Sequence, residues 1–274
     1  MPSYAIHPTA DLRPIAALYE EVGFRPDLVD DLGFLRELGG TVFVATSGWD
    51  VVGAGSCLPF ERTGWVGGVA VHPGHRGAGL GSDLTEAAMR ALEQEGVRTA
   101  LLHATAVAKA LYERLGFVAE TEFAELRGGG ALAPPREAPR IRAAEPDDLE
   151  AVLALDREST GEDRRRLIGA LWPHGALVAE HESRPIGFAL PQRRSSAGAV
   201  VAADPVAGQA LLAAAIEERG EPVRVGVPTG HADALALLEG AGYSEALRTT
   251  RMHRGEAPGW SPERIFATFN LYWG

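Results

Sequence analysis

Apolar positions in the first half of the chain alternate between runs with strand spacing and runs with helix spacing. Between residues 81 and 95, apolar side chains recur every three to four positions, which predicts an amphipathic helix. Short apolar runs bounded by Gly, Ser or Pro predict strands instead. Strands are expected at residues 4–6, 41–46, 51–58, 65–71 and 98–104 and as a pair between 117 and 126, and helices at 11–22, 26–38, 81–95 and 106–115.

The second half of the chain repeats this order of elements. The repeat starts with a strand and helix at 140–155 and continues with a hairpin at 175–191, a strand and helix at 199–220, a strand at 222–227, and a helix with its following strand at 231–245. Such a match indicates an internal duplication. The expected fold class is α/β, with a mixed sheet of the α+β kind, because antiparallel strands come first and βαβ units later. The repeat therefore predicts two similar domains, each with a central mixed sheet flanked by helices.

A Gly-rich and then Pro-rich stretch, "RGGGALAPPREAPR", separates the two halves without apolar periodicity. It predicts a linker at residues 128–140 between domains at 1–127 and 141–274. Near the far end, Ser261 as N-cap and Pro262 in the first turn predict a tail helix. Its apolar face would carry Ile265, Phe266 and Phe269. Packing on its own domain is favoured over a dimer contact or a lid, and the chain is expected to be a monomer or a homodimer.

Composition excludes several classes of partner. The 274 residues are 46% hydrophobic and carry a formal net charge of −11, which argues against nucleic acid and anionic membranes. A small-molecule or cationic partner fits better. No apolar run reaches the length of a membrane span and the N-terminus lacks the pattern of a signal peptide, so a cytoplasmic protein is expected. Cys57, the single cysteine, is interpreted as buried filler.

Residues 69–84, "VAVHPGHRGAGLGSDL", run from a strand through a glycine-rich loop into a helix. Glycines allow positive φ angles and let a ligand approach the backbone, so that successive amides turn toward one anion. The helix start adds unpaired N–H groups and a positive dipole end. The loop therefore predicts a phosphate cradle, with Arg76 as a charged contact. A flexible connection is the alternative, because the lysine and hydroxyl of a P-loop are missing.

This stretch resembles the acetyl-coenzyme A signature of the GNAT N-acetyltransferase superfamily, in which Q/R-x-x-G-x-G/A follows a strand and opens a helix. Here Arg76, Gly79 and Gly81 occupy these positions. Further on, "ALYERLGF" resembles the family's next segment, a helix with a tyrosine just before Gly-Phe. The tandem order also resembles bacterial proteins with an active GNAT domain followed by a divergent one. The resemblance implies an acetyltransferase domain at 1–127 and a divergent, non-catalytic copy at 141–274.

The resemblance also implies which residues hold acetyl-CoA. The backbone of the last strand residues would pair with the pantetheine arm, and the loop amides would hold the pyrophosphate. Tyr112 would stand near the thioester sulfur and protonate the departing thiolate. Thr105 stands where the family often has an asparagine. The threonine hydroxyl would replace the asparagine's contact with pantetheine only in part. The implied cosubstrate-binding residues are Val69, Ala70, Val71, Arg76, Gly77, Ala78, Gly79, Leu80, Gly81, Ser82 and Thr105.

The motifs leave the general base open. Candidates are His103 at the end of a strand, Glu61 in a hairpin, and Glu20 or Glu21 on the first helix, each acting directly or through water. For each, a solvated surface residue is the alternative. His103 is favoured because the ordinary pKa of histidine, about 6.5, suits a base at neutral pH. No metal site is expected, since the eight histidines show no paired spacing and there is one cysteine.

The second copy lacks both features that carry the prediction. It has only "VAG" in place of the glycine loop, and Leu238 stands where Tyr112 does in the first copy. The leading hypothesis is an acetyl-CoA-dependent N-acetyltransferase that uses its first domain and transfers to an amine by direct attack in a ternary complex. A catalytically silent CoA-binding or regulatory module is the alternative, and a scaffold without CoA a third. The acceptor stays open among polyamine, amino acid, aminoglycoside and protein N-terminus, with a small molecule favoured.

Overall fold

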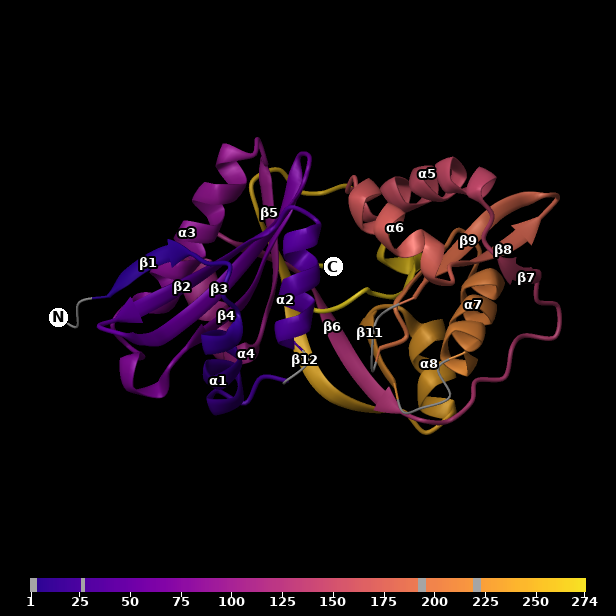
Figure 1. The fold of residues 1–274 in the computed structure, drawn as a ribbon. Helices are drawn as coiled ribbons and strands as arrows, with labels where there is room; N and C mark the ends of the chain where they lie inside the picture. The colour runs from indigo at the N-terminus through magenta and orange to yellow at the C-terminus, as the bar shows by residue number, and fades with distance from the viewer. Residues whose placement is uncertain (1–3, 26–27, 192–195, 219–222) are drawn as a thin grey trace. The chain divides into compact units, whose positions relative to one another are not determined.

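The computed structural model of the chain describes residues 4–25, 28–191, 196–218 and 223–274 (Figure 1). Its contacts form two compact units. Unit 1 comprises Met1–Val118, Met252–Glu256 and Trp273, and unit 2 comprises Ala119–Arg251, Ala257–Tyr272 and Gly274. The elements of unit 1 are β1 (Ala5–Pro8), α1 (Arg13–Glu21), α2 (Leu28–Glu37), β2 (Thr41–Ser47), β3 (Asp50–Phe60), β4 (Thr63–Val71), η1 (Pro73–His75), α3 (Leu80–Gln94), β5 (Thr99–Ala104) and α4 (Ala106–Arg114).

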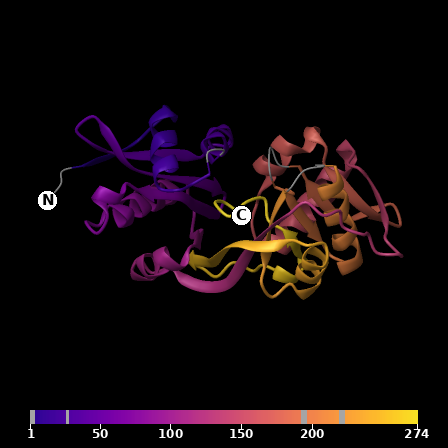
Figure 2. The same cartoon turned by 90° about the horizontal axis from the view of Figure 1, so that it is seen from below.

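A mixed sheet with helices on both faces forms unit 1. Its strands lie in the order β1-β2-β3-β4-β5, followed by the end of β12 (Ser244–Arg254). The strands β1 to β4 are antiparallel, and β4 and β5 run parallel. Helices α1 and α2 lie over one face and α3 over the other (Figure 2). Both faces of β2 carry apolar side chains that a helix layer must cover, because successive side chains of a strand point to opposite faces. Phe43 and Ala45 join the core under α3, while Val42 and Val44 point to the opposite face.

Helix α3 owes its place to the apolar stripe that the sequence predicts. Leu84, Ala88 and Leu92 recur at helical spacing and are at most 1% exposed. Each buried leucine contributes roughly 2 kcal/mol from the apolar surface that it removes from water. The stripe fixes α3 against β2, β3 and β4, so that its N-terminus stands at the end of β4.

The elements of unit 2 repeat those of unit 1 in chain order. They are β6 (Val118–Gly128), β7 (Arg140–Ala143), η2 (Pro146–Asp148), α5 (Leu149–Thr160), α6 (Arg165–Leu171), η3 (Trp172–His174), β8 (Leu177–His181), β9 (Arg184–Leu190), β10 (Ala199–Ala202), α7 (Pro205–Glu217), β11 (Val223–Pro228), α8 (Ala232–Gly240), most of β12, η4 (Pro262–Arg264) and β13 (Ile265–Ala267). Strands β13-β10-β9-β8-β7 form one antiparallel sheet. Strand β6 pairs antiparallel with β11, although it follows the first repeat in sequence.

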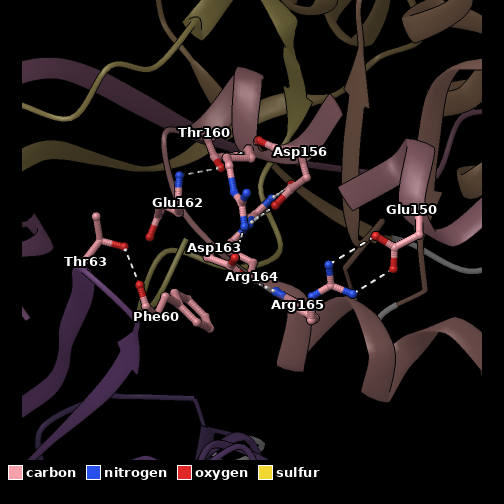
Figure 3. Close-up of polar contacts among 10 residues, drawn as sticks. Phe60, Thr63, Glu150, Asp156, Thr160, Glu162, Asp163, Arg164 and Arg165 are labelled. Atoms are coloured by element: carbon pink, nitrogen blue, oxygen red, sulfur yellow. Dashed lines mark hydrogen bonds and ion pairs between the residues drawn. The ribbon is translucent and has the colours of Figure 1, made fainter. Parts of the chain in front are cut away.

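Two junctions of the fold are visible among the polar contacts of Figure 3. In unit 2, Arg164 donates to Asp156 through Nε (3.1 Å) and Nη2 (2.5 Å), and both side chains are buried. This bidentate ion pair ties α5 to the start of α6, and removal of either partner would leave a buried charge uncompensated. In unit 1, the Thr63 hydroxyl donates to the Phe60 carbonyl (3.3 Å) across the β3–β4 turn.

The predicted fold class is confirmed, because both units are mixed α/β and combine sheets with flanking helices. Apart from the strand pair at 117–126 and the tail helix, the predicted elements are found in the predicted order, and α3 begins at Leu80 and β5 at Thr99. The predicted segments at 26–38, 199–220 and 222–227 include residues from 26–27 or 219–222, and those parts lie outside the described residues. The domain boundaries at 127 and 141 follow the sequence repeat and stay a prediction.

Two expectations about local structure are wrong. The strand pair at 117–126 is the single strand β6, because residues Phe123 to Gly128 pair continuously with β11 and leave no turn. The tail helix after Pro262 is one 3-10 turn, after which β13 pairs with β10. Ile265 and Phe266 favour strands, and the available sheet edge outweighs the helix-start signal of Ser261 and Pro262.

Candidate functional site

Strands β4 and β5 pair over only part of their length. The parallel register joins Thr63 to Thr99, Gly64 to Ala100 and Trp65 to Leu101. Strand β4 then continues to Val71 and β5 to Ala104 without further register pairs between these two described strands. On its other edge β4 stays paired with β3 as far as Val71. The backbone groups of Val69, Ala70 and Val71 that face β5 are therefore available to an extended ligand.

A bulge in β4 lies where this opening begins. Ala54 faces Ala70 and Ser56 faces Gly67, so β4 holds one more residue than β3 over this stretch. Gly68 has φ +63°, a conformation that glycine adopts without strain. A Cβ on Gly68 would lie 2.6 Å from the Tyr19 hydroxyl. The bulge therefore requires glycine at this position.

Two side chains that the sequence analysis missed hold the bulge. The Tyr19 hydroxyl of α1 donates to the Gly68 carbonyl (2.8 Å), and the Ser56 hydroxyl of β3 donates to the Gly67 carbonyl (3.0 Å). Tyr19 and Ser56 are both fully buried. The adjacent Gly67 and Gly68 within a strand pattern were the available sequence signal for a bulge, but they do not reveal which side chains anchor it.

The glycine loop follows directly after β4. The amide of His72 donates to the Val52 carbonyl, which ends the pairing with β3, and Pro73–His75 form one 3-10 turn. Gly77 and Gly79 have φ angles of +76° and +90°, and a Cβ added at either would meet nothing within 4 Å. Gly79 is the N-cap of α3 and provides no side-chain cap. The loop thus leaves open space beside the first amides of α3, which have no intrahelical acceptor.

The charges at this helix start are mixed. Arg76 is exposed, and its Nε donates to the Val71 carbonyl at 3.1 Å, so the side chain folds back over the end of β4. Asp83 lies in the first turn of α3 and accepts a hydrogen bond from the Tyr4 hydroxyl. That bond raises the pKa of Tyr4. The loop amides and Arg76 favour an anion, and the Asp83 carboxylate offsets part of this attraction.

Helix α4 packs close to the start of α3. A Cβ on Gly81 would lie 3.2 Å from the Leu111 side chain of α4, so this glycine permits close helix packing. Thr105 is the exposed N-cap of α4, and its hydroxyl makes no capping bond. The hydroxyl is therefore not committed to the helix and is available to a ligand.

Tyr112 lies on the α3 face of the sheet. It is 8% exposed and belongs to the core cluster with Leu102 and Ala104 of β5, and its ring makes an edge contact with Phe117 (5.9 Å between centroids). Burial raises the pKa of Tyr112 to about 12, so the hydroxyl keeps its proton at neutral pH. A protonated phenol is the form that a proton donor needs.

His103 lies on the opposite face of β5. Side chains alternate along a strand, and Leu102 and Ala104 point to the Tyr112 side. The half-buried His103 ring stacks instead on Trp65 of β4, with 5.4 Å between centroids and 12° between planes. The structure therefore places the two predicted catalytic side chains on the two faces of β5, past its last pair with β4.

The other base candidates lie in different settings. Glu61 is exposed in the β3–β4 turn with φ +52°, at the end of β4 away from the glycine loop. Glu21 lies 3.0 Å from the His72 Nε2, and Glu20 is exposed on α1. Glu21 is thus engaged with the histidine at the end of β4, while Glu20 and Glu61 face solvent.

Cys57 is buried, and burial raises the pKa of its thiol to about 12. The thiolate, which is the reactive form, is therefore not populated at neutral pH. Among the described residues, no group of three or more His, Cys, Asp or Glu side chains is arranged to hold a metal ion. The described helices also include none that is long and apolar enough to cross a bilayer.

Comparison with known proteins agrees with this geometry. Family models described as acetyltransferase (GNAT) domains match residues 39–119 and again residues 152–267. Mycothiol acetyltransferases from Streptomyces scabiei (strain 87.22) and Streptomyces coelicolor (strain ATCC BAA-471 / A3(2) / M145) are 48% and 46% identical over 61 residues. Each match covers 21% of this chain and 20% of the relative, so the chain shares only about a fifth of their length.

Solved structures show the same fold over the whole chain. A putative acetyltransferase from Pyrococcus horikoshii superposes with a TM-score of 0.85 at 20% identity and covers 100% of this chain and 97% of its own. A tandem GNAT protein from the clavulanic acid biosynthesis pathway gives 0.61 at 16% identity over 93% of this chain and 99% of its own. The fold and the two matches define a protein built from two acetyltransferase-type domains in tandem. The chain belongs to the GNAT superfamily.

Proposed function

We propose that the protein transfers an acetyl group from acetyl-CoA to an amine of a small-molecule acceptor, by direct attack in a ternary complex. The observation that carries this proposal is the opening between β4 and β5. Their pairing ends at Trp65 and Leu101, and β4 then runs unpaired with β5 to the glycine loop and the uncapped start of α3. Acetyl-CoA would supply an activated acetyl group and a diphosphate. An extended arm between two strands and an anion at a helix start are what these features accommodate.

Each predicted residue has a role that its position supports. The backbone of Val69, Ala70 and Val71 would pair with the pantetheine arm, with Thr105 as a further contact. The amides of Arg76, Gly77, Ala78, Gly79, Leu80, Gly81 and Ser82 would hold the pyrophosphate. The bulge that Tyr19 and Ser56 hold fixes where β4 turns away from β5.

The chemistry needs one proton donor and one acceptor. Tyr112 would donate a proton to the departing thiolate, and its hydroxyl keeps that proton because burial raises its pKa. His103 would accept a proton from the amine, directly or through water. A lysine-like amine is charged at pH 7, and its deprotonation costs about 4 to 5 kcal/mol, against about 1 kcal/mol for an α-amine. A base is therefore needed most for lysine-like acceptors.

The test is thiol release from acetyl-CoA with a panel of a polyamine, an amino acid, an aminoglycoside and a peptide N-terminus. With the amine that reacts, Tyr112→Phe lowers kcat by about a hundredfold or more, because a positioned proton donor contributes at that scale. CoA affinity stays within twofold of wild type, since the ring and its contact with Phe117 remain.

The matched control is Tyr243→Phe in unit 2. Tyr243 is likewise buried, and within the described chain its hydroxyl has no hydrogen-bond partner. Its removal leaves kcat unchanged. Absence of thiol release with every amine despite tight CoA binding, with Tyr112→Phe indistinguishable from wild type, would support the silent module and reject the enzyme proposed here.

A further inference from the structure

Strand β13 lies between two strands of unit 2 that do not pair with each other. It pairs antiparallel with β10, where Val200 faces Ala267 and Val201 faces Ile265. On its other side Thr268 bridges to Gly226 of β11, and the Thr268 amide donates to the Gly226 carbonyl at 2.9 Å. The closing segment, residues 257–272, therefore fills a slot between β10 and β11.

This slot is the repeat counterpart of the β4–β5 opening. In chain order β10, α7, β11 and α8 of unit 2 match β4, α3, β5 and α4 of unit 1. Packing supports the match: Leu84 of α3 lies over Gly53 of β3, and Leu211 of α7 lies over Gly187 of β9. Aligned on these leucines, Gly208 of α7 corresponds to Gly81 of α3.

Phe266 occupies the centre of the filled slot. It is completely buried, and a Cβ on Gly208 would lie 2.1 Å from its ring. The His231 ring makes an edge contact with it, with 4.2 Å between centroids. His231 caps α8, where it accepts from the Ala234 amide at 3.4 Å, and its position corresponds to Thr105 at the start of α4. An aromatic side chain thus lies between the counterparts of Gly81 and Thr105.

The start of α7 is closed to an anion. Asp204 is its N-cap, and its carboxylate accepts from the Ala207 amide at 2.9 Å. The N-cap of α3 is instead Gly79, which has no side chain. A carboxylate on the helix amides repels a diphosphate and takes the hydrogen bonds that it would need. What this slot accepts is an uncharged extended backbone.

The segment before β13 is also bound within unit 2. The Ser261 amide donates to the Ser159 carbonyl at 2.8 Å, and a Cβ on Gly161 would lie 2.8 Å from the Gly259 carbonyl. Trp260 stacks on Phe123 at 6.0 Å, and the Arg251 guanidinium lies 4.1 Å from the Trp260 ring. These contacts define a recognition surface for a peptide with a tryptophan and a phenylalanine six residues apart.

The geometry points to a peptide-binding slot in unit 2, between β10 and β11, whose ligand is the chain's own closing segment. Unit 2 binds this strand through its backbone and Phe266, in the place where unit 1 receives the thioester arm. The comparison with the thioester arm rests on the function proposed above. The slot itself rests on the contacts of β13, so one chain binds one CoA and one internal peptide.

The test separates the closing segment from the folded chain without removing it. A protease site inserted after the exposed Ala257 allows cleavage of the full-length protein once it has folded. A fluorescent synthetic peptide of residues 258–271 is then added in excess below the unfolding temperature. We expect it to replace the cleaved segment at one peptide per chain, and not to bind the uncleaved protein.

Two matched peptides probe recognition. Phe266→Ala in the peptide weakens competition at least tenfold, because the ring against Gly208 is lost. Glu263→Ala, at an exposed position, competes as well as the parent peptide. Equal competition by the Phe266→Ala peptide overturns the proposal. So does a cleaved segment that never exchanges, because it is then a fixed strand of the fold.

CoA binding on the same samples separates the two proposals. One CoA per chain before and after cleavage, without peptide exchange, rejects the slot and leaves the proposed function standing. Peptide exchange without CoA binding keeps the slot and rejects the proposed function.

Discussion

The two units contain the same strand-helix-strand order and treat the gap between their central strands in opposite ways. In unit 1, β4 and β5 stop pairing after Trp65 and Leu101, and the helix that follows β4 begins with an uncapped glycine. In unit 2, the corresponding gap holds β13, and the helix that follows β10 begins with Asp204, whose carboxylate accepts from the Ala207 amide. A duplicated framework thus retains a gap between its central strands, and the two proposals above assign that gap different classes of ligand.

A few residues account for the difference. The N-cap residues Gly79 and Asp204 decide whether a helix start is open to an anion, and on the next helix Leu238 replaces Tyr112, the proposed proton donor. Leu238 is completely buried and joins the apolar core of unit 2. Packing is preserved at these positions while chemistry is not, so loss of a site does not require loss of a fold.

A large effect, of the same order as that of Tyr112→Phe, is expected at His103. His103→Gln lowers kcat about a hundredfold, because a positioned general base contributes on that scale. Steady-state kinetics with the reactive amine measure this change.

Glu61→Gln is the control, since Glu61 is exposed in the β3–β4 turn. It leaves kcat within twofold. If Glu61→Gln costs as much as His103→Gln, the base is not His103.

The next effect concerns the open helix start of unit 1. Gly79→Val weakens CoA binding about thirtyfold, because Gly79 has φ +90° and a side chain there would cover the loop amides. A left-handed conformation costs a residue other than glycine roughly 1 to 2 kcal/mol. Isothermal titration with CoA gives the affinity.

Gly96→Val is a close control, because Gly96 has φ +84°, has no neighbour within 4 Å and follows the other end of α3. Both variants lose similar fold stability, but only Gly79→Val loses affinity. Similar CoA affinities for the two variants would argue against the phosphate cradle.

A smaller effect follows from the β4 bulge. Tyr19→Phe removes the donor to the Gly68 carbonyl and leaves that buried acceptor unpaired, which costs about 1 to 3 kcal/mol of stability. CoA affinity falls about tenfold, because the bulge sets where β4 leaves β5. Thr63→Val removes a hydroxyl-to-carbonyl bond at the other end of β4 and leaves affinity unchanged. Equal affinities for both variants would show that the bulge has no part in binding.

Sequence alone predicts most of this framework, because glycine-bounded apolar runs and helical stripes such as Leu84, Ala88 and Leu92 specify local structure. It also predicts the glycine loop and Tyr112 as candidates. It does not predict the anchors Tyr19 and Ser56, since their partners are backbone carbonyls far along the chain. The prediction of a tail helix is wrong for a related reason. Ser261 and Pro262 are local signals, whereas the ladder between β13 and β10 is a long-range interaction.

The smallest effect is expected in the pH dependence of the two buried tyrosines. Burial raises the pKa of Tyr112 to about 12, and burial also raises the pKa of Tyr243. Tyr112, the proposed proton donor, therefore stays protonated, and kcat holds level from pH 8 to 10, whereas an exposed phenol would be half ionised at about pH 10.

The unfolded chain releases these protons first, near pH 10, so the free energy of unfolding falls as pH rises from 10 toward 12. At pH 11, the free energy of unfolding of the Tyr112→Phe variant has fallen by about 1 kcal/mol less than that of the wild type, as measured by urea unfolding. Tyr243→Phe also makes this fall smaller. The two substitutions differ in one respect, because only Tyr112→Phe changes kcat. A fall of kcat by half at pH 10 in the wild-type enzyme would show that its proton donor is a group less buried than Tyr112.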